Sequence, residues 1–391
     1  MIEINTSFFD MEVINNIYQN EEFINNLVNS IKTNLEGNSH IVVKELLQTW
    51  LCDESGAPNQ SKIIHYLLNT TPEEYIESFY QKAAEKIEGN AALGEVLKVW
   101  PTPLENALNI DDYALRKQII AEVITPNSLC MFSGITKADL DAEPTRNTLW
   151  SNKTKLKLIK LQHSKDYEKL KTTFEEIFDY DKFSVKYRTK LLAAMKVTVC
   201  PYCNRQYITI YDTIKENKAT ADLDHFFCKD LYPFLALSLY NFVPSCQICN
   251  SRFKLAKDFY KHPHVNPYRA GFADNCVFKF ETLHGLIDDK DPKYSLFNSI
   301  NNTAIDNSIE TFHLNSVYQS HIDYVKELIT KVKLYNTSQI LEYLSNFPEL
   351  FGSRAELLQL LYGTYLNPNE VGLRPLSKLT QDILKDLCVE F

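Results

Sequence analysis

The feature that most constrains this chain of 391 residues is a repeated Cys-x-x-Cys pair. The pairs are Cys200/Cys203 and Cys246/Cys249. A CxxC turn places both sulfurs on one side of a tight loop, so two such turns can supply four thiolates to one ion. One CxxC alone is also compatible with a redox motif, but two pairs favour zinc. Four protein ligands leave no position for water, so we expect a structural Zn2+ that stabilises the fold and performs no chemistry.

The composition is that of a globular protein in which the cysteines stay reduced. Apolar residues make up 45% of the chain and charged residues 23%, which excludes a largely disordered protein. No window approaches the roughly 18 uncharged apolar residues that a membrane helix needs. The first residues also lack the basic-then-apolar order of a signal peptide. We therefore expect a cytoplasmic chain with no membrane partner, in which the nine cysteines do not form disulfides.

The pattern of apolar residues predicts an α+β fold that is mostly helical. Helical spacing dominates the first 140 residues and residues 308–391. Short runs at 221–227 and 277–283 predict strands, and residues 246–257 predict a helix. We divide the chain into a helical N-terminal region over 1–150, a segment over 151–300 with a zinc-stabilised core, and a helical C-terminal region over 301–391. The N-terminal region is expected to regulate the core or to dock a partner.

The net charge of −9 conceals an asymmetry along the chain. Residues 151–270 hold 21 of the 41 Lys and Arg but only 12 of the 50 Asp and Glu. This segment is therefore positive, whereas the rest of the chain is strongly negative. A basic middle segment is typical of a face that binds a polyanion such as nucleic acid. Solvated helix faces are the alternative explanation, and charge alone does not exclude them.

A second group of polar residues lies between and directly after the two cysteine pairs. Asp224-His225 and Asn241 lie between the pairs, Asn250 follows the fourth cysteine, and Lys254 comes four residues later. Over residues 200–254 this order, LDHF…LYNFVPSCQICNSRFK, resembles the four-cysteine form of the HNH, or ββα-metal, nuclease family. The resemblance implies a small zinc-stabilised ββα-metal core between the two helical regions.

The chemistry that such a nuclease needs is consistent with these residues. A hard cation such as Mg2+ or Mn2+ prefers oxygen ligands and keeps several waters, and Asp224 and the amide oxygen of Asn250 are suitable ligands. His225 points to the opposite side of its strand from Asp224 and can act as the general base toward water. In the family the middle Asn holds the loop that orients the catalytic His, and Asn241 matches that position.

Three basic residues are candidates for contacts to substrate phosphates, namely Lys254, Arg252 and Arg205. The sequence departs from the family pattern at two points. Asn250 stands where many members have His, and Arg252-Phe253 replaces the Gly-containing turn that usually precedes the Lys. Cys228 lies close enough to His225 in sequence to compete as a thiolate ligand, although four sulfurs already complete a zinc site.

The resemblance implies a metal-dependent HNH endonuclease that hydrolyses phosphodiester bonds of nucleic acid, with DNA as the expected substrate. The order DHFFCKDLYPFLALSLYNFVPSCQICN, then NPY, then FHLNS at 312–316 is also similar to the HNH subunit of Septu-type antiphage systems. That similarity implies a role in antiviral defence with an ABC-like ATPase partner, and a homo-oligomer is a further expected assembly. The alternatives are an RNA-cleaving toxin and a non-catalytic, zinc-stabilised module that binds nucleic acid. A pure binder, however, needs neither a base nor an open metal site.

Overall fold

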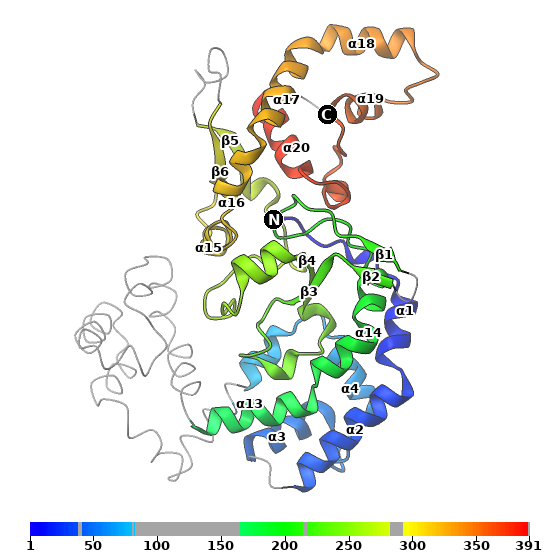
Figure 1. The fold of residues 1–391 in the computed structure, drawn as a ribbon, viewed down its shortest axis with the longest axis vertical. Helices are drawn as coiled ribbons and strands as arrows, with labels where there is room; N and C mark the ends of the chain where they lie inside the picture. The colour runs from blue at the N-terminus through cyan, green and yellow to red at the C-terminus, as the bar shows by residue number, and fades with distance from the viewer. Residues whose placement is uncertain (38–40, 80–81, 83–164, 214–216, 282–291, 390–391) are drawn as a thin grey trace, which may run out of the picture.

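The computed structural model describes residues 1–37, 41–79, 82, 165–213, 217–281 and 292–389. It confirms the predicted class, because the described part is α+β and mostly helical, with three small two-stranded sheets (Figure 1). None of the described helices is both long enough and apolar enough to cross a bilayer. Of the predicted N-terminal region over 1–150, residues 83–150 lie outside the described residues.

The described N-terminal part contains the helices α1 (Met11–Tyr18), α2 (Glu21–Glu36), α3 (Ile41–Leu51) and α4 (Gln60–Leu67), and residues 73–79 are also helical. Asn20 caps α2 by accepting a hydrogen bond from the Phe23 amide. Ile24, Leu27 and Ile31 then recur at helical spacing and are buried, as their pattern predicts. These helices pack against α13 (Lys165–Ile177), which leads into α14 (Tyr180–Met195).

Helix α14 lies between the N-terminal helices and the central strands (Figure 1). On one side, Phe183 packs against Tyr18, and the Tyr187 hydroxyl donates a 3.0 Å hydrogen bond to Asn20. On the other side, Arg188 donates a 2.7 Å hydrogen bond to the Ala221 carbonyl. One helix therefore contacts both the N-terminal helices and the strand that carries the predicted catalytic residues.

The centre of the molecule is an antiparallel hairpin of β3 (Ala221–His225) and β4 (Phe242–Cys246), followed by the short π-type helix η5 (Cys249–Lys254). Its register pairs Asp224 with Val243 and His225 with Phe242. The strand predicted at 221–227 is confirmed over β3, and the helix predicted at 246–257 is confirmed over 247–254. The loop between β3 and β4 contains two 3-10 turns, η3 (Pro233–Leu235) and η4 (Leu239–Asn241). A smaller hairpin, β1 (Ile210–Asp212) with β2 (Asn217–Ala219), precedes β3.

The C-terminal part contains a third hairpin and a set of helices. Strands β5 (Cys276–Phe280) and β6 (Tyr294–Asn298) pair in antiparallel fashion, and β5 covers most of the strand predicted at 277–283. The helices are α15 (Thr303–Thr311), α16 (Leu314–Tyr318), α17 (Ile322–Leu334), α18 (Thr337–Asn346), α19 (Arg354–Tyr362) and α20 (Ser377–Asp386). Short 3-10 turns complete the described elements, namely η1 (Thr6–Phe8), η6 (Ala273–Asn275), η8 (Gln319–His321) and η9 (Pro368–Leu373). On α17, Val325 and Leu328 are fully buried and face the core.

The described parts of the three predicted segments share one hydrophobic core, which runs from Met1 to Leu384. Segments from near both ends of the described chain contact the first CxxC turn. The Ile2 amide donates to the Pro201 carbonyl, and the Leu376 amide donates to the Asn204 carbonyl. The division into three functional regions stays a prediction, and the packing of the central part depends on both flanks.

Candidate metal centre and active-site cleft

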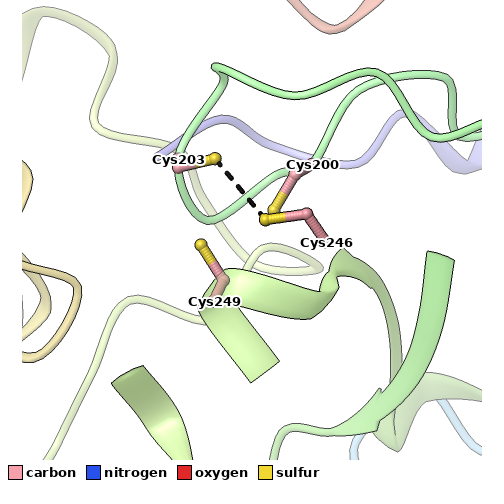
Figure 2. Close-up of side chains that lie close together, drawn as sticks. All are labelled: Cys200, Cys203, Cys246 and Cys249. Carbon is pink, nitrogen blue, oxygen red and sulfur yellow. Dashed lines mark hydrogen bonds between the residues drawn. The ribbon is translucent and has the colours of Figure 1, made fainter. Parts of the chain in front are cut away.

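The four predicted zinc ligands come together in one buried cluster. Figure 2 shows the thiol groups of Cys200, Cys203, Cys246 and Cys249 converging from two separate turns of the chain. Their sulfur atoms all lie within 4.8 Å of one another, and those of Cys203 and Cys246 are 4.0 Å apart. Zn–S bonds of about 2.3 Å in a tetrahedron place sulfurs about 3.8 Å apart. The spacing and the all-sulfur donor set therefore fit a structural metal ion such as zinc.

The local chain conformation brings the sulfurs into this arrangement. The Asn204 amide donates a 2.8 Å hydrogen bond to the Cys200 carbonyl, which closes the first turn. Asn204 itself adopts a left-handed backbone conformation with φ of 50°, which Asn tolerates better than most residues. The second pair spans the end of β4 and the start of η5, so a strand and a helix fix its two cysteines.

The cluster also favours the thiolate form at one of its members. The pKa of Cys246 is lowered because the thiols of Cys200, Cys203 and Cys249 donate hydrogen bonds to it. Burial raises the pKa of Cys200, since its thiolate would lose hydration. A bound cation would stabilise all four thiolates together, which is the usual reason for four cysteines in one buried site.

A cleft of about 440 Å³ lies beside this cluster and contains most of the other predicted site residues. Asp224, His225, Asn250 and Lys254 all line it. Its other walls come from α14, β3, the chain after β3, and η5. The other polar residues that line it are Tyr180, Ser184, Arg188, Asp222, Cys228, Lys229, Asp230 and Ser251. The structure thus brings together residues that are up to 76 positions apart in the sequence, from Tyr180 to Ala256.

Asp224 is nearly buried and is held from two sides. Its Oδ2 accepts a 2.6 Å hydrogen bond from the hydroxyl of Tyr202, which lies inside the first CxxC turn. Its Oδ1 accepts a 3.1 Å hydrogen bond from the ammonium group of Lys254. Burial raises the pKa of Tyr202 well above its ordinary value, and the negative charge of Asp224 raises it further. Tyr202 therefore stays protonated and donates to the carboxylate.

His225 is buried at the end of β3, between the rings of Tyr180 and Phe242. Its Nε2 lies 2.9 Å from the Ala236 carbonyl. Because a carbonyl oxygen can only accept, Nε2 carries the hydrogen and Nδ1 is the basic nitrogen. Burial lowers the pKa of His225 to about 4, against smaller opposing effects from that carbonyl and Asp224. The imidazole is therefore neutral at pH 7, as a general base must be.

Asn241 is fully buried and fixes the loop that leads from β3 to β4. Its Oδ1 accepts a 2.7 Å hydrogen bond from the Phe227 amide, and its Nδ2 donates to the carbonyls of Phe227 and Leu235 at 3.0 and 3.1 Å. The next residue after Leu235 is Ala236, whose carbonyl holds the His225 ring. Asn241 thus acts on His225 through the loop, in the manner that the resemblance implies.

Asn250 is held by a carboxylate that the sequence analysis missed. Its Nδ2 donates a 3.0 Å hydrogen bond to Asp222, which also accepts from Ser251 and from Arg188. Asp222 accepts only, so it fixes the amide nitrogen of Asn250 toward itself. A sequence signal for Asp222 was present, because residues two apart on a strand share a face and Asp222 precedes Asp224 by two.

The three predicted phosphate contacts lie in different places. Lys254 is buried, with its ammonium group bonded to Asp224 and, at 2.6 Å, to the His225 carbonyl. Arg252 is exposed on η5. Arg205 contacts the C-terminal part, where its Nε donates a 2.9 Å hydrogen bond to His321. Lys254 is therefore part of the interior of the site, and Arg205 lies outside the residues that line the cleft.

Cys228 lies on the cleft and not in the sulfur cluster, which contains only the four predicted cysteines. Burial raises the pKa of its thiol, so it stays protonated near neutral pH. Among the described residues, the four cysteines are also the only group of three or more His, Cys, Asp or Glu whose ligand atoms lie close together.

Comparisons with protein-family models, with curated proteins and with solved structures return no match for this chain. The function is therefore inferred from the chemistry and geometry of the two sites.

Proposed function

We propose that this chain is a metal-dependent HNH-type endonuclease that hydrolyses phosphodiester bonds of nucleic acid, with DNA as its substrate. The observation that supports this best is the state of His225 in the cleft. Its ring is neutral, its Nε2–H is held by a backbone carbonyl, and it lies beside Asp224 and Asn250. A module that only binds nucleic acid has no need for a fixed imidazole with a basic Nδ1.

In the proposed reaction, Nδ1 of His225 accepts a proton from the attacking water. The Ala236 carbonyl keeps the ring in this tautomer, and Asn241 keeps the loop that carries that carbonyl in place. Asp224 and the amide oxygen of Asn250 would hold Mg2+ or Mn2+, which supplies Lewis-acid stabilisation of the phosphate and of the leaving oxygen. Carboxylate and amide oxygens are the ligands that these cations prefer, so the donor set fits them.

The proposed substrate path is the open cleft between α14 and η5. Arg188 and Lys229 line it, and Arg252 is exposed on η5. Positive side chains at a cleft attract the phosphate backbone and release its counterions. A base that activates water does not require a 2′-hydroxyl, so the proposed chemistry permits DNA as the substrate, and RNA is the alternative that the test below includes. The defence role, the ABC-like ATPase partner and a homo-oligomer stay predictions from the resemblance.

The test is single-turnover cleavage of DNA and RNA oligonucleotides of the same sequence, with Mg2+ or Mn2+ added. We expect cleavage of DNA, and a rate lower by about 10²–10⁴ in His225→Ala with an unchanged zinc content. The matched control is His264→Ala, which removes a half-buried histidine whose pKa is also lowered but which does not line the cleft. Cleavage by His225→Ala at the unmodified rate would contradict the mechanism. Binding of DNA and RNA without cleavage of either would instead support the binding module.

A further inference from the structure

We infer that Tyr202 is a positioning residue through which the cysteine site fixes the carboxylate of Asp224 in the neighbouring cleft. The inference rests on the proposed role of Asp224 as a ligand of a divalent cation. Tyr202 is the middle of the first CxxC turn, and its hydroxyl lies 2.6 Å from Asp224 Oδ2. This hydrogen bond joins the first CxxC turn directly to the cleft.

Tyr202 has little freedom to move once the first CxxC turn is formed. It is fully buried, and its ring stacks on Phe312 with centroids 4.5 Å apart and planes at 19°. The Cys200 amide donates to the Gln206 carbonyl, and the Asn204 amide donates to the Cys200 carbonyl, so both sides of the turn are hydrogen bonded. A metal ion on Cys200 and Cys203 would constrain the same turn further. The hydroxyl of Tyr202 therefore occupies a fixed point beside the cleft.

The other support of Asp224 comes from a separate part of the chain. Lys254 is at the end of η5, with its ammonium group bonded to Asp224 Oδ1 and 5.0 Å from the centre of the Phe259 ring. With both donors in place, the two oxygens of the carboxylate have fixed directions. Without the Tyr202 hydroxyl, only Lys254 restrains the group, so the carboxylate can rotate about its terminal torsion.

Outer hydrogen bonds of this kind tune metal affinity, and their loss typically weakens binding about 10- to 100-fold. Tyr202→Phe removes one oxygen atom and retains the ring that stacks on Phe312. We therefore expect Tyr202→Phe to keep its zinc and its fold, and to bind Mn2+ in the absence of nucleic acid about 10-fold more weakly. The cleavage rate should recover at saturating Mn2+, because the variant weakens metal binding and leaves His225 in place.

The matched control is Tyr318→Phe. Tyr318 is also buried, and its hydroxyl also donates to the first CxxC turn, at the Cys203 carbonyl 2.5 Å away. It makes no hydrogen bond to Asp224. If loosening of the turn were the cause, both variants would weaken Mn2+ binding, whereas the inference predicts the effect in Tyr202→Phe alone.

The measurement is the Mn2+ dissociation constant, from the electron paramagnetic resonance signal of free Mn2+, with zinc per chain measured in the same samples. An unchanged Mn2+ affinity in Tyr202→Phe, or an equal loss in Tyr318→Phe, would overturn the inference and leave the proposed function intact. If the unmodified chain bound no Mn2+, or if Asp224→Ala bound Mn2+ as tightly as the unmodified chain, the proposed metal site would be wrong. The inference about Tyr202 would then be wrong as well.

Discussion

The cysteine cluster and the neighbouring cleft differ in the one property that decides what a metal can do. The four cysteines are buried and present four sulfurs to one point, so an ion there has no free position. The cleft has about 440 Å³ of open space and presents oxygen ligands together with an imidazole. A closed site stabilises the fold, whereas an open site lets substrate and water reach the metal. The comparison therefore supports a structural role for the first site and is the basis of the chemistry proposed for the second.

The two sites are nevertheless built from the same short elements. Ala221 at the start of β3 pairs with Cys246 at the end of β4, while Asp224 and His225 lie at the other end of β3. On η5, Cys249 faces the cluster and the next residue, Asn250, lines the cleft. Loss of zinc from the cysteine cluster should therefore disturb the cleft. Loss of metal binding in the cleft should leave zinc in the cysteine cluster. This asymmetry can be tested in both directions.

The largest effect is expected from Cys203→Ser. The variant should lose zinc and unfold the central part, because binding of structural zinc contributes about 10–16 kcal/mol in small zinc domains. Zinc per chain and thermal unfolding measure the result, and Mn2+ binding in the cleft should disappear with the fold. Cys388→Ser is the control, since Cys388 is exposed and lies outside the cluster. If Cys203→Ser folded normally without zinc, the cluster would have no structural role.

A smaller loss of stability should follow from Asp224→Asn. This change removes a proposed metal ligand and leaves the ammonium group of Lys254 buried without its partner, and such broken pairs typically cost about 3–5 kcal/mol. The double variant Asp224→Asn/Lys254→Met removes both charges and should regain most of the free energy of unfolding. It should still fail to bind Mn2+. Restored Mn2+ binding in the double variant would show that Asp224 is not a ligand.

Variants of Arg252 and Arg205 test which part of the basic segment contacts nucleic acid. Arg252 is exposed on η5, whereas Arg205 contacts the C-terminal part. Arg252→Ala should weaken DNA binding several-fold and reduce the salt slope of the binding constant by about 1, because one phosphate contact is lost. Arg205→Ala should leave the slope unchanged, since this side chain contacts Ser320 and His321. The salt dependence of DNA affinity measures both. An equal salt slope of the DNA-binding constant in the two variants would show that the nucleic acid does not contact Arg252.

The last effect concerns pH and His264, which is outside both sites. Burial lowers the pKa of His264 to about 3, below the ordinary value of 6.5. The unfolded chain binds the proton first, so stability is lost as the pH falls below about 6.5, by up to about 1.4 kcal/mol per pH unit. His264→Gln should make the free energy of unfolding less dependent on pH between 6.5 and 5. The control is His65→Gln, because His65 is exposed. If the free energy of unfolding had the same pH dependence in the unmodified chain and in both variants, burial of His264 would not be the cause.

Local patterns in the sequence were sufficient for the class, for strands β3 and β5, and for the cysteine cluster. Strand β3 is a short run of alternating residues, and the CxxC spacing fixes two sulfurs per turn whatever surrounds it. The role of Asn241 came from the family resemblance and not from a local pattern. In the structure, Asn241 makes three hydrogen bonds to the loop before β4.

Contacts between distant segments could not be predicted in this way. The hydrogen bond from Tyr202 to Asp224 and that from Arg188 to Asp222 join residues 22 and 34 positions apart. Lys254 was expected to face a phosphate because residues four apart share a helix face. In the π-type η5 the Leu255 amide bonds to the Asn250 carbonyl five residues back, which changes that spacing and is consistent with the burial of Lys254.

The division between a structural zinc site and a catalytic cleft is tested most directly by separating the two metals. The protein is passed into metal-free buffer, and zinc per chain and single-turnover DNA cleavage are measured before and after addition of Mg2+ or Mn2+. We predict one zinc per chain throughout, no cleavage before the addition, and cleavage after it in the unmodified chain but not in His225→Ala. Cleavage at full rate without added Mg2+ or Mn2+, or a rate that follows zinc content alone, would contradict the account.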